Sequence, residues 1–357
     1  MKRRKEGNNM IPLTKKRLNY IDSIKGFGIW LVVLGHLLDP GNYLKSYIYG
    51  FHMPLFFSVY GMTYKCPESV SSLAKRIIKR FFSYGVTYFI WALIYCQFNI
   101  RNFLLVMWGT NDSLIYAKSS GVLWFLPCYF ISCVIFEIVM FFFINKKNGI
   151  FITFGLFSFF AIAGCLLGIP NFISYRLPWG IDIALIASLF LWFGYFFKNI
   201  FLPMVLKKKA AGFILIPVCS VVCVLSIFVK TQNGYVRMAS GDYGNFPVFL
   251  LTAISGILFI SLIIFFLDKI SIVSKVLSSL GQYSLVIMVL QRDVTNFYQS
   301  YIPSKYDLTI VAVICSVIIT ALLYVASYII SNLLPFMAGK YKNISIKFFR
   351  KKITIIK

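Results

Sequence analysis

The stretch IDSIKGFGIWLVVLGHLL, residues 21–38, is apolar enough for a membrane helix, yet it contains three ionisable side chains. Asp22 and Lys25 lie near its start, and His36 lies deep inside it. A charged side chain at the bilayer centre costs roughly 2.5–3.5 kcal/mol on insertion scales. On a helix, Lys25 and His36 are about three turns, or roughly 16 Å, apart and share one face, which Asp22 extends. Asp22 and Lys25 alone are typical of side chains that reach the headgroups from a helix end, but this does not explain His36.

The second histidine of the chain, His52, lies in the stretch YGFHMPLFFSVYGM, residues 49–62. If this stretch begins the next membrane span, His52 lies at a depth close to that of His36. A single buried histidine is more often structural, but two at one depth favour a function. Imidazole titrates near neutrality and can take a proton from a hydroxyl, so His36 is our candidate general base. His52 is the second candidate, as its partner, as an acceptor ligand or as a structural residue.

The composition is that of a membrane protein. Hydrophobic residues make up 59% of the 357 residues and charged residues 13%, whereas soluble domains have about 25% charged residues. The net charge of +25 does not indicate nucleic-acid binding, because the basic residues lie between apolar runs. The eight cysteines fall mostly inside these runs without a CxxC pair, so we expect small core residues, with no disulfide and no metal site.

The apolar runs predict an all-α integral membrane protein with about ten transmembrane helices. The predicted spans are 23–38, 47–64, 80–98, 121–143, 149–168, 181–197, 211–229, 246–267, 278–296 and 308–334. Lys and Arg are concentrated in alternate connections, which places both termini in the cytoplasm. The expected organisation is a basic cytoplasmic arm at 1–20, a transmembrane domain at 21–335 and a basic cytoplasmic tail at 336–357. The polar stretch 99–120 is too short to cross and is expected to be interfacial.

A basic cluster opens the third predicted span, in SSLAKRIIKRFFSYGVTYFIW, residues 71–91. Arg76 and Arg80 are one turn apart, with Lys75 and Lys79 beside them. One interpretation is charge that fixes topology. The other is an anion site, because guanidinium groups match phosphate geometry.

Aromatic and charged residues also begin spans on the expected outer side: Trp124, Arg176, Trp179 and Asp182. They suit sugar recognition, although an interfacial aromatic belt explains the tryptophans equally simply and is the favoured interpretation.

These stretches, in this order, resemble the membrane-bound acyltransferase-3 family, and especially its fucose 4-O-acetylase-like branch. The resemblance rests on RLNYIDSIKGFGIWLVVLGH (17–36), FHMPLFFSVYGM (51–62), the basic motif, LWFLPCYF (123–130), LPWGIDIALIASLFLWFGYFFK (177–198) and LSSLGQYSLVIMVLQ (277–291). It implies ten-helix enzymes of the cytoplasmic membrane that transfer an acyl group, commonly acetyl from acetyl-CoA, to a sugar hydroxyl of a cell-surface or exported polysaccharide.

By position, the resemblance implies that His36 is essential and that Lys25 is its basic partner. It also implies that Arg76 and Arg80 form the donor-side motif. The family's arginines are usually three apart, whereas residue 77 here is Ile, so the motif is expected to consist of Arg76 with Arg80 or of Arg76 with Lys79. Gln291 stands where the family often has a histidine, so its expected role is hydrogen bonding to the substrate.

The sequence thus predicts an acetyl-CoA-dependent O-acyltransferase without a metal. Its candidate catalytic residues are His36, His52 and Asp22, with Asp22 orienting Lys25. Its candidate donor-binding residues are Lys25, Arg76, Lys79 and Arg80, and its candidate substrate-binding residues are Trp124, Arg176, Trp179, Asp182 and Gln291. Expected partners are membrane lipids, the glycan acceptor and polysaccharide assembly proteins. A transporter or flippase of a lipid-linked glycan is the main alternative, and a non-enzymatic subunit of an assembly complex is another.

Overall fold

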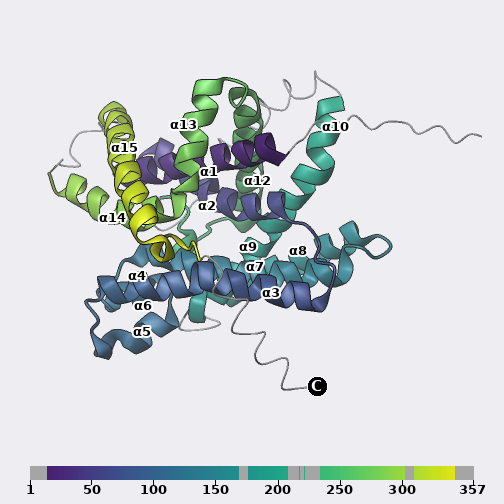
Figure 1. Cartoon of the computed structure of the whole chain (residues 1–357), viewed down its shortest axis with the longest axis horizontal. Helices are drawn as coiled ribbons and strands as arrows, with labels where there is room; N and C mark the ends of the chain where they lie inside the picture. Colours follow the sequence, from purple (N-terminus) through teal and green to yellow (C-terminus); the bar gives the residue numbers. More distant parts are fainter. Residues whose placement is uncertain are drawn as a thin grey trace, which may run out of the picture.

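The apolar runs form helices in the computed structural model of the chain, which describes residues 14–168, 176–207, 234–301 and 309–341 together with Pro217 and Val221 (Figure 1). In these residues the one extended feature is an isolated bridge between Arg237 and Asp242, so the predicted all-α class is confirmed there. The helices are α1 (Thr14–Leu37), α2 (Tyr43–Thr63), α3 (Val70–Arg80), α4 (Thr87–Tyr95), α5 (Phe103–Trp108), α6 (Asn111–Tyr116), α7 (Phe125–Phe143), α8 (Gly149–Leu167), α9 (Ile181–Phe196), α10 (Leu202–Lys207), α12 (Phe246–Leu267), α13 (Ser271–Gln282), α14 (Ser284–Tyr301) and α15 (Thr309–Leu333).

Six helical segments are long and apolar enough to cross a membrane, and α13 with α14 forms a seventh, bent candidate. The six are Val70–Tyr95, Gly121–Phe143, Gly149–Leu167, Pro178–Val205, Phe246–Leu267 and Thr309–Leu333. The chain is therefore a multi-pass membrane protein. Helices α1 and α2 cover the first two predicted spans but are too polar to belong to the six. The predicted span 211–229 lies outside the described residues, apart from Pro217 and Val221, and ten spans with cytoplasmic termini stay a prediction.

Both predicted domain boundaries, at residues 20/21 and 335/336, fall within the residues that the structure describes. Helix α1 begins at Thr14, inside the stretch predicted as a basic arm. The predicted tail is described as far as Tyr341, after a short 3₁₀ turn at Pro335–Ala338. In that turn the Met337 carbonyl accepts a hydrogen bond of 2.8 Å from the Trp91 indole, which attaches the end of the described chain to α4.

Close backbone approach at four glycines fixes the two helices that carry the histidines. Helix α1 packs along α13, and α2 packs along α9. A Cβ on Gly26 or Gly281 would collide with the facing backbone of the α1–α13 pair. A Cβ on Gly61 or Gly194 would likewise collide with the facing backbone of the α2–α9 pair. Small residues are the usual means by which membrane helices approach closely, so both crossings are specified by sequence.

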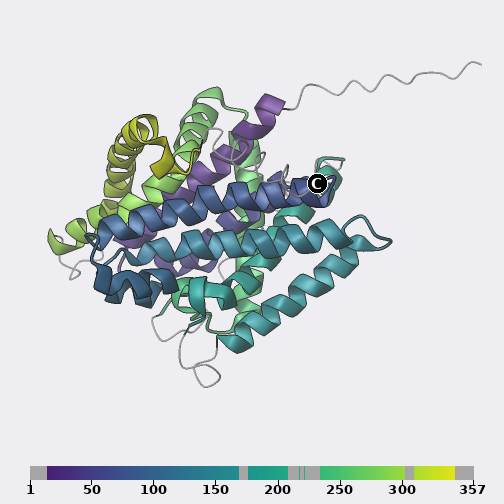
Figure 2. The same cartoon turned by 60° about the horizontal axis from the view of Figure 1, so that its bottom comes forward.

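Helices α3 and α4 form one long segment through a π-helical turn, Phe81–Val86. This segment runs beside α7 (Figure 2). The stretch 99–120 contains α5 and α6, whose six residues each are too few to span a bilayer. Helices α13 and α14 meet at Tyr283 at an angle of 77°, so the predicted ninth span is broken. The break turns α14 across the end of α1, where the candidate site lies.

Candidate functional site

A cavity of about 760 Å³ lies where the end of α1 meets the first half of α2, the segment 235–239, the start of α7, and α14. Four sequence-predicted site residues line it together: His36, His52, Trp124 and Gln291. Its volume falls within the roughly 300–1,000 Å³ range of small-molecule sites. The sequence positions of these residues span most of the chain, so the cavity is a product of the tertiary fold.

His36 occupies the last turn of α1 and is half-buried. Its ring makes no hydrogen bond to any described residue, and its closest recorded ring neighbour is Tyr49, with centroids 6.0 Å apart. The backbone carbonyl of His36 accepts a hydrogen bond of 2.7 Å from the Gln299 side chain of α14. The end of α1 is thus held through its backbone, while the imidazole nitrogens have no hydrogen-bond partner in the described part of the chain.

His52 is 4% exposed and holds a defined tautomer. Its Nδ1 lies 2.9 Å from the Ile48 carbonyl oxygen. A carbonyl oxygen can only accept, so Nδ1 carries the proton and Nε2 of the neutral ring is an acceptor. The Tyr49 ring lies 4.7 Å from the His52 ring and also contacts His36. Tyr49 is therefore the shared neighbour of the two histidines, a residue that the sequence analysis did not single out.

Gln291 is completely buried, and neither its amide nitrogen nor its amide oxygen has a hydrogen-bond partner in the described part of the chain. An unsatisfied buried polar group costs about 1–3 kcal/mol, so an amide in this state inside a cavity points to a ligand. Trp124 also lines the cavity and is buried.

Three cations also line this cavity: Lys45, Arg237 and Arg292. None of them is among the candidate site residues chosen from the sequence. Lys45 lies four residues before Tyr49 and seven before His52, so all three share one face of α2. That spacing was the signal available in the sequence.

Lys25 and Asp22 lie near the opposite end of α1 and do not line the cavity. The Lys25 ammonium and the Asp22 carboxylate form an ion pair of 2.5 Å, in a part-exposed position beside α13. The polar stripe predicted on α1 therefore consists of two separate features, an ion pair at one end and His36 at the other.

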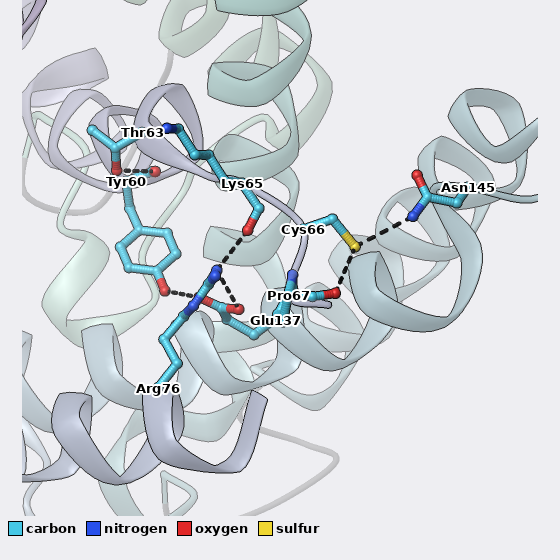
Figure 3. A network of polar contacts seen from close by, with 8 residues as sticks. All are labelled: Tyr60, Thr63, Lys65, Cys66, Pro67, Arg76, Glu137 and Asn145. Atoms are coloured by element: carbon cyan, nitrogen blue, oxygen red, sulfur yellow. Dashed lines mark hydrogen bonds and ion pairs between the residues drawn. The ribbon is translucent and has the colours of Figure 1, made fainter. Parts of the chain in front are cut away.

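Arg76 forms an ion pair with a carboxylate that the sequence analysis overlooked. Its guanidinium lies 3.0 Å from Glu137, a side chain of α7 that is 2% exposed, and it donates a bond of 2.7 Å to the Lys65 carbonyl (Figure 3). The Tyr60 hydroxyl donates to the same carboxylate. A single glutamate in the apolar run CVIFEIVMFFF was a sufficient signal. Arg76 is thus engaged in joining α2, α3 and α7.

Arg80 and Lys79 differ from Arg76 in lacking an acidic partner among the described residues. The Arg80 guanidinium lies over the Tyr60 ring, 4.8 Å from its centroid, and its buried Nε has no hydrogen-bond partner among the described residues. Lys79 is exposed on the same helix. Neither residue lines the cavity that contains His36.

Contacting aromatic rings connect the cavity wall to the position of Arg80. Phe125 belongs to the cavity wall, and its ring contacts Phe57 and Tyr129 at centroid distances of 5.2 and 5.1 Å. Tyr129 in turn contacts Tyr60, at 6.1 Å, on which Arg80 lies. The two polar regions are joined by these packed rings and not by the cavity itself.

Arg176, Trp179 and Asp182 lie next to the cavity and brace its surroundings. Arg176 pairs with Asp182 at 2.6 Å and donates to the Ser240 carbonyl of the short turn after Arg237. The Trp179 indole donates to a carbonyl of α5 at 2.8 Å. A very small pocket lined by Arg176 adjoins the main one through shared walls, but these three residues do not line the main cavity.

The described cysteines are free thiols, and Cys219 and Cys223 lie outside the described residues. No group of three His, Cys, Asp or Glu side chains suited to a metal occurs in the described ranges.

Comparison with known proteins identifies the family. Residues 18–331, which include both histidines and the whole cavity, match the family model described as an acyltransferase domain of the acyltransferase-3 type. No curated protein and no solved structure matches the chain. Because this match covers far more than half of the sequence, the protein belongs to the acyltransferase-3 family and is a membrane acyltransferase.

Proposed function

We propose that the protein transfers an acetyl group from cytoplasmic acetyl-CoA to a sugar hydroxyl of a cell-surface or exported polysaccharide, in the cytoplasmic membrane. The observation that carries the proposal is the His36 imidazole, which lines a substrate-sized cavity without a hydrogen bond to the described residues. The resemblance to the fucose 4-O-acetylase-like branch supports the glycan acceptor.

In the proposed reaction His36 removes the proton of the acceptor hydroxyl, and the oxygen attacks the thioester carbonyl. A C–O bond forms, the C–S bond breaks, and the CoA thiolate takes the proton from the imidazolium, so the histidine is regenerated. Gln291 can donate an amide N–H to the carbonyl oxygen or hydrogen-bond to the acceptor. In the alternative, the His36 imidazole attacks the thioester itself and forms an acyl-imidazole, from which the acceptor hydroxyl then takes the acetyl group. This route uses the same residues.

The donor phosphates are proposed to lie at the other end of α2, near Arg80, Lys79 and Lys25. Arg80 is the best suited, because its buried Nε lacks a partner in the described part of the chain and a guanidinium binds phosphate strongly. Arg76 contributes to this region by holding α3 in place, since its own charge is already paired with Glu137.

The test is His36→Gln, which keeps a side chain of hydrogen-bonding capacity but cannot transfer the proton. Acetyl transfer from labelled acetyl-CoA is measured in membranes, and the acetyl content of the surface glycan is measured by mass spectrometry. We expect loss of transfer by at least about 100-fold, the scale of general-base catalysis. Lys118→Gln, an exposed site outside the cavity, is the control. Full activity of H36Q would overturn the proposal.

The same experiment tests the transporter alternative. A flippase whose proton path includes His36 would lose glycan export in H36Q while the acetyl content of each exported repeat stayed constant. The enzyme that we propose shows the reverse, with normal export and missing acetyl groups. An inactive subunit would show neither change.

A further inference from the structure

The cavity around the histidines carries an excess of positive charge. Three of its lining residues are cationic, Lys45, Arg237 and Arg292, whereas Asp39 is its one acidic lining residue. The ion pairs among the described residues are Lys25–Asp22, Arg76–Glu137 and Arg176–Asp182. None of them includes a cation of the cavity.

Lys45 shows the imbalance most clearly, because it is 5% exposed. Its ammonium donates a hydrogen bond of 2.7 Å to the Leu38 carbonyl and lies 5.5 and 4.9 Å from the ring centroids of Tyr49 and Tyr235. These partners are neutral, and the charge of Asp39, which also acts on Lys45, is not within ion-pair distance of it. A buried charge is retained at a cost of several kcal/mol unless an opposite charge approaches it.

Arg237 and Arg292 reach the same space from separate elements. The Arg237 backbone is held in an isolated bridge, with its N–H donating 2.8 Å to the Asp242 carbonyl. Arg292 follows Gln291, whose buried amide atoms lack partners in the described ranges. Both guanidinium groups are half-buried and form no ion pair within the described residues. The cavity thus combines three cations with an unsatisfied amide beside His36.

We propose that this cavity selects an acceptor that carries an oxyanion, a carboxylate or a phosphate, close to the hydroxyl that becomes acylated. The proposal rests on the proposed function, since it takes the ligand of the cavity to be the acceptor. Lys45, Arg237 and Arg292 hold the oxyanion, Gln291 binds a neighbouring polar group, and the hydroxyl faces His36. If the donor phosphates lie near Arg80, as proposed above, they do not supply this anion, because the rings of Phe57, Phe125, Tyr129 and Tyr60 lie between that region and the cavity wall.

Binding to the full chain in lipid nanodiscs tests the proposal without any need for turnover. Matched probes are methyl β-glucuronide against methyl β-glucoside for a carboxylate, and glucose 1-phosphate against glucose for a phosphate. Dissociation constants are measured by saturation-transfer NMR for the wild type and for Lys45→Gln, Arg237→Gln and Arg292→Gln. Arg101→Gln removes an exposed positive charge that does not line the cavity and is the control.

We expect the wild type to bind at least one anionic probe about tenfold more tightly than its neutral match, as one charge-assisted hydrogen bond provides. Each cavity variant should reduce this preference, R237Q combined with R292Q should abolish it, and R101Q should retain it. Equal affinity of the wild type for the charged and neutral members of both pairs would overturn the proposal. So would variants that weaken binding of CoA, used as a further probe, while leaving the sugar probes unaffected.

The outcome is separable from that of the acetyl-transfer test. A charge preference that depends on these cations, in a protein that transfers no acetyl group, would leave the anion site standing and remove the proposed function. Acetyl transfer that depends on His36, in a protein without the charge preference, would support the proposed function and remove the anion site.

Discussion

Removal of the Arg76 side chain tests whether this residue stabilises the fold or binds the donor. Arg76→Ala leaves the Glu137 carboxylate buried in α7, with the Tyr60 hydroxyl as its remaining side-chain donor among the described residues. Glu137 is 2% exposed, whereas Arg76 is 27% exposed, so the lost partner was itself partly hydrated. The structure therefore predicts a loss of stability that originates in the carboxylate left behind.

Breaking a buried ion pair costs about 3–5 kcal/mol, and the partial exposure of Arg76 places the expected loss near the lower limit, about 3 kcal/mol. A double-mutant cycle isolates the pair: R76A, E137A and the double variant are unfolded by SDS in mixed micelles. The coupling energy should be about 2–3 kcal/mol, with E137A largely relieving the cost of R76A. Lys79→Ala, at an exposed position of the same helix, should stay within about 0.5 kcal/mol of the wild type.

A coupling energy below about 0.5 kcal/mol would refute the reasoning, because it is the value expected of independent sites. A second result would do so independently: an R76A protein of unchanged stability whose KM for acetyl-CoA is raised. Arg76 would then bind the donor, as the sequence alone predicted.

Three further predictions concern the cavity and the helix crossings. Gln291→Leu should raise the free energy of unfolding by about 1 kcal/mol, because it removes an unsatisfied amide, while raising the acceptor KM; unfolding and steady-state kinetics measure the two effects. His52→Asn keeps a donor for the Ile48 carbonyl and should retain most of the kcat that H36Q loses, as kinetics on membranes would show. Gly281→Leu should prevent accumulation in the membrane, because its side chain would collide with the backbone of α1; immunoblotting measures this, and Gly155→Leu, which has open space, is the control.

The sequence was sufficient for the helices because their signal is local. Apolar runs at 121–143, 149–168 and 246–267 agree with the helical segments Gly121–Phe143, Gly149–Leu167 and Phe246–Leu267 to within one residue. The break between α13 and α14 was not predicted. Hydropathy over a window reports average burial and is insensitive to a change of direction at a single residue, which here is Tyr283.

Site residues could be predicted where a single polar side chain interrupts an apolar run. A histidine or a glutamine inside an apolar run is conspicuous, and His36, His52 and Gln291 do line one cavity. Their roles stay predictions. Charges near the ends of spans were not conspicuous, because membrane proteins place cations there for topology. That Arg237 and Arg292 meet Lys45 depends on the turn of α14 and on the position of the segment 235–239, which arise from packing between distant parts of the chain.

The two polar ends of α2 set a geometric requirement on the proposed reaction. Lys45 and Tyr60 are about 22 Å apart along the helix at 1.5 Å per residue, so phosphates near Arg80 and an acceptor near Lys45 cannot touch. The thin acyl-carrying arm of the donor must therefore extend between them, through the rings of Phe57, Phe125 and Tyr129. Aromatic side chains can change rotamer to admit a narrow chain and close again behind it. An apolar layer of this kind also keeps water from the thioester, which favours attack by the bound hydroxyl over hydrolysis. In the proposed reaction, the aromatic rings between the Arg80 region and the histidine-lined cavity would therefore confine acetyl transfer to the bound acceptor.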